Sequence, residues 1–89
     1  MSSTYLDGNA IGGLLWEVFG VEMTVATGVC GGCGATRPVA ELHVYVRAAG
    51  TVVRCPSCDT VLMTVVETPD RRWVGLSGLA RLEVPRAET

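Results

Sequence analysis

The 89-residue sequence contains no lysine, and its seven basic side chains, all arginine, are outnumbered by nine acidic ones. The formal net charge is −2 at pH 7. General binding to nucleic acid needs a basic surface that neutralises phosphates. This balance of charge argues against such a role, and we expect that nucleic acid is not the partner.

Histidine occurs only once, at position 43. Nucleophilic catalysis requires a nucleophile and a base within hydrogen-bond reach of each other. No serine, cysteine or carboxylate is recognisably paired with His43 in the sequence. We therefore interpret His43 as a surface side chain and expect that the protein is not an enzyme.

Long hydrophobic runs are also missing. No stretch approaches the roughly 18 apolar residues of a membrane-spanning helix. The first residues lack the basic and apolar regions of a secretory signal. We expect a cytoplasmic protein without membrane contact, in which thiols stay reduced and paired cysteines bind metal.

The cysteines, in contrast, are present and are regularly spaced. All four cysteines lie in two C-x-x-C pairs, Cys30/Cys33 and Cys55/Cys58, with 21 residues between the pairs. Four thiolates about 2.3 Å from one ion form the tetrahedral site that zinc prefers. We predict one Zn²⁺ per chain, bound by Cys30, Cys33, Cys55 and Cys58.

Two other interpretations of the cysteines stay open. Iron fits the same four-sulfur geometry and would make the site an electron-transfer centre. Disulfides or a redox-active pair are the third interpretation. A redox pair is typical of a βαβ unit, and the sequence shows no such pattern.

The residues around each pair suit a tight metal-binding turn, here called a knuckle. Gly34 follows the first pair, where a left-handed backbone is expected, and glycine adopts it at little cost. Asp59 holds the matching position in the second knuckle, and aspartate tolerates this conformation better than most residues. Gly31 and Gly32 predict a looser first knuckle.

The N-terminal region predicts a helix over residues 7–20. Asp7 is a good N-cap, and Gly20 is placed to end the helix. Apolar residues recur at the spacing of one helical face: Ile11, Leu14, Leu15, Val18 and Phe19. This face either covers the sheet of the same chain or forms a docking surface, with Trp16 at its rim.

The remainder predicts antiparallel strands over residues 22–29, 39–47, 51–54, 60–68, 72–76 and 79–84. In residues 39–47, Ala40, Leu42, Val44 and Val46 alternate with polar residues and are expected to face the core. Pro69 and Asp70 predict a turn. Trp73 is expected to pack across the sheet, with an aromatic anchor at an interface as the alternative.

These elements predict a small, mostly-β, zinc-ribbon-like domain, in which the N-terminal helix packs on an antiparallel sheet with two C-x-x-C knuckles at one end. Residues 1–89 form a single domain: the helix of 7–20, a β region of 21–84, and flexible ends at 1–6 and 85–89.

Several arginines could serve either of two roles. With Arg37, Arg47 and Arg54, the side chains of His43 and Tyr45 could form a basic and aromatic stripe suited to single-stranded nucleic acid. Arg54, next to Cys55, could instead offset the formal −2 charge of a four-thiolate zinc site.

The two knuckles look like the paired knuckles of zinc ribbons. In addition, the stretches Leu6-Asp7-Gly8-Asn9-Ala10, Glu17-Val18-Phe19-Gly20 and Ala40-Glu41-Leu42-His43-Val44-Tyr45 resemble an actinobacterial family of short uncharacterised proteins. This resemblance extends from about Leu6 to Val84. It implies the zinc-ribbon-like fold, and the family carries no assigned activity.

The sequence favours a non-catalytic zinc-binding module that acts through a protein partner, with a monomeric chain and a dimer as the alternative. One rival is a rubredoxin-like iron electron carrier that serves an oxidoreductase. The other is a zinc ribbon that binds nucleic acid.

Overall fold

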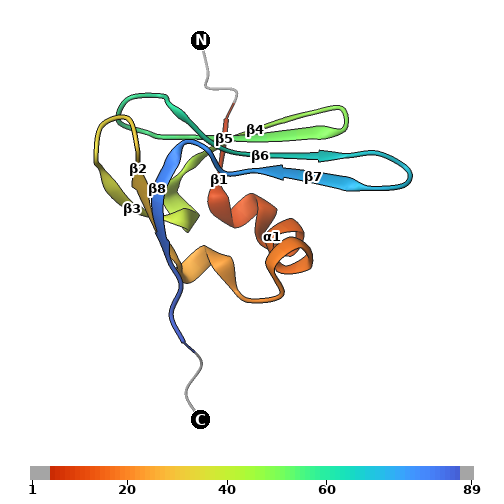
Figure 1. The fold of residues 1–89 in the computed structure, drawn as a ribbon, viewed down its shortest axis with the longest axis horizontal. Helices are drawn as coiled ribbons and strands as arrows, with labels where there is room; N and C mark the ends of the chain where they lie inside the picture. The colour runs from red at the N-terminus through yellow and green to blue at the C-terminus, as the bar shows by residue number, and fades with distance from the viewer. Residues whose placement is uncertain (1–4, 87–89) are drawn as a thin grey trace.

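A computed structural model describes residues 5–86 and contains two antiparallel sheets and one α-helix (Figure 1). The larger sheet has the strand order β1 (Leu6–Asp7), β4 (His43–Arg47), β5 (Gly50–Arg54), β6 (Val61–Glu67), β7 (Arg72–Gly75). The smaller has the order β3 (Thr36–Pro38), β2 (Thr27–Cys30), β8 (Leu79–Glu83). The predicted mostly-β fold with one helix is therefore confirmed.

Helix α1 (Gly12–Phe19) is shorter than the predicted helix of residues 7–20. Gly20 ends it as expected: its φ is 74°, and its N–H donates to the carbonyl of Trp16 at 2.8 Å. The start is different, because Gly8–Ile11 forms a 3₁₀ helix and Asp7 belongs to β1, where its side chain makes no capping hydrogen bond.

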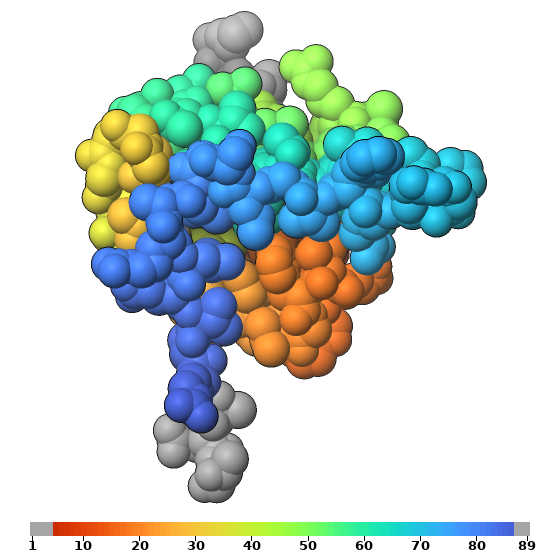
Figure 2. Space-filling view, in the orientation of Figure 1, coloured from red at the N-terminus to blue at the C-terminus, as the bar shows by residue number. Residues whose placement is uncertain are grey.

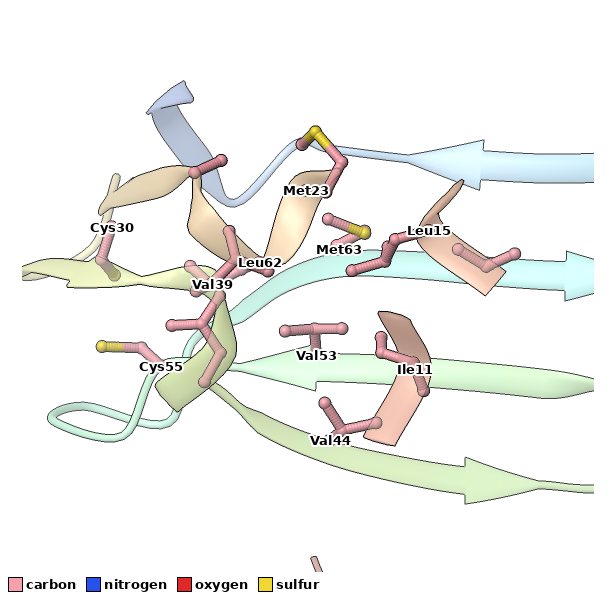
Figure 3. Packing of buried hydrophobic residues seen from close by; sticks show 13 residues of the cluster. Ile11, Leu15, Met23, Cys30, Val39, Val44, Val53, Cys55, Leu62 and Met63 are labelled. Carbon is pink, nitrogen blue, oxygen red and sulfur yellow. The ribbon is translucent and has the colours of Figure 1, made fainter. Parts of the chain in front are cut away.

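The core lies between α1 and one face of the five-stranded sheet (Figure 3). Leu15 of α1 is fully buried, and Ile11 is 7% exposed. Both belong to the same cluster as Val44, Val53 and Met63 from β4, β5 and β6. The apolar side of the helix thus covers the chain's own sheet, which was one of the two interpretations of this segment.

Two predicted strands begin later than expected. In residues 22–29, Met23–Val25 forms a 3₁₀ helix and β2 starts at Thr27. In residues 39–47, Val39–Glu41 forms another 3₁₀ helix, and β4 starts at His43. The N–H of Val39 donates to the carbonyl of Ala26 at 2.8 Å, which holds the two 3₁₀ segments together.

The alternation of core-facing residues predicted for residues 39–47 is correct only at its two middle positions. Leu42 and Val44 are buried, but Val39 takes the buried place expected for Ala40 because the chain turns there. Val46 is 53% exposed, since it lies at the end of β4 beside the turn into β5.

Residues 69 and 70 form the predicted turn between β6 and β7, closed by a 2.9 Å hydrogen bond from Thr68 N–H to the carbonyl of Arg71. Trp73 lies directly opposite Val66 of β6 in the sheet, but it is not buried there. Its side chain is 57% exposed, and the Arg71 guanidinium lies 5.9 Å from its ring centroid. Trp73 is on the edge strand β7, where no further strand covers it.

The predicted flexible ends fall mainly outside the described residues, which exclude residues 1–4 and 87–89. Within the described part, Leu6 pairs with Val44 in the large sheet, and the Tyr5 ring stacks on His43.

Gly78 marks a close approach of two backbone segments. A Cβ atom at this position would lie 1.8 Å from the carbonyl oxygen of Val61. We expect Gly78→Ala to destabilise the protein by about 1–3 kcal/mol or more, the usual cost of overpacking. Gly13→Ala is the matched control, because a Cβ there meets no atom within 4 Å and alanine raises helix propensity by up to about 1 kcal/mol. Denaturant unfolding of the metal-loaded proteins measures both, and equal stabilities would contradict the close approach.

Candidate metal centre

Two hairpins from different sheets bring the cysteines together. The first knuckle, residues 30–34, connects β2 to β3, and the second, residues 55–59, connects β5 to β6. The two loops lie side by side at one end of the molecule, as the yellow and teal surfaces show (Figure 2). A metal bound here would therefore tie the small sheet to the large one.

The four sulfur atoms have the spacing of a metal site. All four lie within 4.8 Å of one another. The Sγ atoms of Cys30 and Cys58 are 3.6 Å apart, and those of Cys33 and Cys55 are 3.7 Å apart. A disulfide would bring two sulfurs to about 2.05 Å. A tetrahedron with metal–sulfur distances of about 2.3 Å separates them by about 3.8 Å. The sulfurs thus fit a tetrahedral ion.

The two knuckles have the same backbone conformation and the same backbone hydrogen bond. Gly34 and Asp59 both have left-handed backbones, with φ of 78° and 67°, as the sequence predicted. Their N–H groups donate to the carbonyls of Cys30 and Cys55 at 2.9 and 2.8 Å. Each knuckle is therefore the same tight turn, with glycine in one and aspartate in the other.

Backbone and side-chain donors point at the sulfurs. The N–H of Gly32 lies 3.2 Å from Cys30 Sγ, and that of Ser57 lies 3.3 Å from Cys55 Sγ. The hydroxyl of Thr60 lies 2.9 Å from Cys58 Sγ. The backbone N–H groups of Gly32 and Ser57 stabilise the thiolate form that a metal requires. Thr60 was not among the predicted site residues, although a hydroxyl two residues after a ligand cysteine is a signal that could have indicated it.

Backbone N–H groups, neighbouring thiols and burial shift the thiol pKa values in different directions. The backbone N–H of Cys33 is the main cause that lowers the pKa of Cys30, to about 6. At Cys33 the N–H of Ala35 lowers the pKa, but hydrogen bonds with neighbouring thiols and burial together raise it to about 11. Burial raises the pKa of Cys55, but the N–H groups of Cys58 and Ser57 outweigh it and the net shift is downward. Because a metal must displace the remaining protons, its affinity falls as the pH falls.

The site is closed on one side and open on the other. Cys30 and Cys55, the first cysteine of each knuckle, are each 2% exposed and belong to the hydrophobic core. Cys33 and Cys58 are exposed. The metal would therefore stabilise the core from its edge while two of its sulfurs face solvent.

Glycines in the first knuckle serve close contacts rather than looseness. A Cβ at Gly32 would lie 2.5 Å from the Thr60 hydroxyl oxygen, which comes from the other knuckle. The N–H of Gly31 donates to the carbonyl of Gly78 at 2.8 Å. The absence of side chains thus lets the knuckles and the β7–β8 connection pack together.

Two arginines support the second knuckle. Arg54, singled out in the sequence, donates through Nη1 to the Asp59 carbonyl at 3.0 Å. Arg37, from β3 of the other sheet, donates to the Ser57 hydroxyl at 3.1 Å. Both guanidinium groups thus bond to the knuckle itself.

His43 lies apart from this cluster. Its ring stacks on Tyr5 with centroids 3.6 Å apart. Within residues 5–86, the groups that could hold a metal consist of the four cysteines alone. The same range contains no helix long and apolar enough to cross a membrane.

Comparison with known proteins assigns the chain to a family but finds no similar curated protein or solved structure. A family profile matches residues 2–87, and that family is described as a family of unknown function (DUF6510). No curated protein and no solved structure matches the chain significantly.

Proposed function

We propose that this chain, which belongs to the DUF6510 family, is a non-catalytic zinc-binding protein whose metal holds together a surface for a protein partner. The observation that carries the metal part is the gathering of four cysteine sulfurs within 4.8 Å of one another. The closed set of four thiolates, without an open coordination position, is typical of structural zinc sites.

The ligand set favours zinc or iron over ions that prefer oxygen. Four thiolates in tetrahedral geometry suit zinc or iron, whereas magnesium and calcium prefer oxygen ligands. A reducing compartment such as the cytoplasm would keep the four thiols available for the metal. We further propose that residues 1–89 act as one domain, because the metal would join both sheets.

Support for a protein partner comes from exposed apolar side chains beside α1. Trp16 is 53% exposed, and Val21 and Val25 are 42% and 59% exposed. With Pro85 and Arg86 they line a depression of about 350 Å³. Tryptophan is enriched among the residues that dominate binding at protein interfaces. This depression is the surface that we assign to the partner.

One observation favours a second function. Because Cys33 and Cys58 are exposed, an iron ion in the same site would lie close to the surface, as an electron carrier for an oxidoreductase requires. The identity of the bound metal distinguishes the two functions.

Metal analysis tests the proposal directly. Protein produced with zinc and iron both present should be colourless and contain one zinc per chain by elemental analysis. Colourless protein with well below one zinc per chain would contradict the zinc site. Red, redox-active protein from the native host would instead establish the electron carrier.

The partner surface needs its own experiment. The wild-type protein and a Trp16→Ala variant are each used to capture proteins from an extract of the native host. A protein retained by the wild type and lost with the variant would support the surface. Identical capture by both proteins would contradict it.

A further inference from the structure

The outer face of the five-stranded sheet, opposite α1, carries a pocket of about 430 Å³. It is lined by Tyr45 and Arg47 of β4, Val52 and Arg54 of β5, and Asp59 of the second knuckle. This volume is within the range of small-molecule sites. The zinc proposal and the partner surface use none of these side chains for binding.

The middle of the pocket is formed by Tyr45 and Val52. These residues are direct partners in the β4–β5 register, so their side chains lie next to each other on the same face. Both are half-buried. They offer a partly apolar and partly aromatic floor.

One end of the pocket presents donors and an acceptor together. Arg54 Nη1 lies 3.0 Å from the backbone carbonyl oxygen of Asp59 and 3.5 Å from the carboxylate Oδ2 of Asp59. The Arg54 guanidinium lies over the Tyr45 ring, 5.8 Å from its centroid. These contacts fix the guanidinium but use only one of its three nitrogens. The remaining N–H groups and the Asp59 carboxylate can therefore bond to the edge of a ligand.

The other end carries an unpaired positive charge. Arg47 is exposed at the end of β4, and its guanidinium forms no ion pair or hydrogen bond within the described residues 5–86. It lies four residues along β4 from His43, the register partner of Arg54. At about 3.3 Å per residue the two ends are roughly 13 Å apart along the strand, too far for one small anion to touch both.

We propose that this pocket binds a nucleotide, with its base over Tyr45 and Val52 and its phosphate on Arg47. A nucleobase is planar, and its edge carries donors and acceptors that match the Asp59 and Arg54 groups. Bases stack on aromatic side chains and on guanidinium planes, and arginine pairs with phosphate through parallel hydrogen bonds. The pocket thus has groups for the edge of the base at one end, for the face of the base in the middle and for the phosphate at the other end. These parts follow one another in the same order along a nucleotide.

The nucleotide is either free or part of a single strand. The chain's net charge of −2 disfavours the many phosphate contacts that bind a long strand. We therefore expect a free nucleotide, and an oligonucleotide serves as the second arm of the test.

Calorimetric titration of the metal-loaded protein with AMP, GMP, CMP and UMP at low salt tests the pocket. Inorganic phosphate and the four nucleosides serve as partial ligands. At least one nucleotide should bind more tightly than its nucleoside and than phosphate. Arg47→Gln should weaken that binding by at least about tenfold, the effect of losing a charge-assisted hydrogen bond.

Two further variants test whether the binding is specific to this pocket. Arg81→Gln is the matched control, because Arg81 lies on β8 of the other sheet and pairs with Glu83 at 3.1 Å. It should bind the nucleotide as the wild type does. Asp59→Asn should change the preference among the four bases, since an amide with one acceptor and a donor replaces an acceptor-only carboxylate. Asparagine also tolerates the left-handed backbone. Circular dichroism confirms that each variant is folded.

The proposal is overturned if none of the four nucleotides binds at millimolar concentration and a single-stranded oligonucleotide does not bind either. It is also overturned if binding occurs but is unchanged by Arg47→Gln. Tighter binding of the oligonucleotide that is still lost with Arg47→Gln would support the pocket and identify a nucleic-acid strand as the source of the nucleotide.

Discussion

Cys55→Ser is expected to abolish metal binding and to unfold both sheets, and Cys30→Ser is expected to do the same. Serine is a poor zinc ligand, and the free energy of zinc binding is folding free energy, about 10–16 kcal/mol for small structural sites. The net stability of a whole domain is only about 5–15 kcal/mol. Both cysteines are 2% exposed and part of the core, so each loss also removes packing.

The measurement is the thermal transition by circular dichroism, together with the zinc content of each variant. Ser57→Ala is the matched control, because Ser57 is in the same knuckle and is exposed, and its hydroxyl accepts a hydrogen bond from the Arg37 side chain at 3.1 Å. It should keep one zinc and a native transition. A native-like transition in Cys55→Ser or Cys30→Ser after chelation of the metal would show that the site does not hold the fold.

The second large effect is expected from Leu15→Ala, which should cost about 2–5 kcal/mol, the range for a buried leucine. Leu15 is fully buried between α1 and the sheet (Figure 3). Its helix has eight residues and begins with Gly12 and Gly13, so it depends on this packing.

Trp16→Ala is the control for this loss, because Trp16 is the next residue and is 53% exposed. It should change stability far less although it removes a larger side chain. Denaturant unfolding at fixed zinc concentration measures both variants. We expect a monomer in each case. A dimer that dissociates on Leu15→Ala while each chain stays folded would mean that the helix works as a docking surface.

The gathering of the four cysteines was predictable because its signal is local. Two residues between cysteines and a left-handed residue after each pair are properties of the chain within a few positions. Gly34 and Asp59 accordingly have the backbone that the sequence predicted. The antiparallel pairing of β6 with β7 followed similarly from the turn predicted at Pro69 and Asp70.

Other features depend on segments that are distant in sequence, and these were missed. Gly8 and Gly78 are close to the backbones of Val39 and Val61, which no periodicity reveals. The strands β1 and β3 have only two and three residues, too few for a pattern. Trp73 is apolar and on a strand, but its exposure follows from the edge position of β7, which only the assembled sheet shows.

X-ray absorption at the zinc edge of the purified protein tests the central claim most directly. The four cysteine sulfurs lie within 4.8 Å of one another, so a bound zinc ion should contact all of them. We predict a single shell of four sulfur atoms at about 2.3 Å. A shell that contains nitrogen or oxygen, or fewer than four sulfurs, would contradict the four-cysteine zinc site.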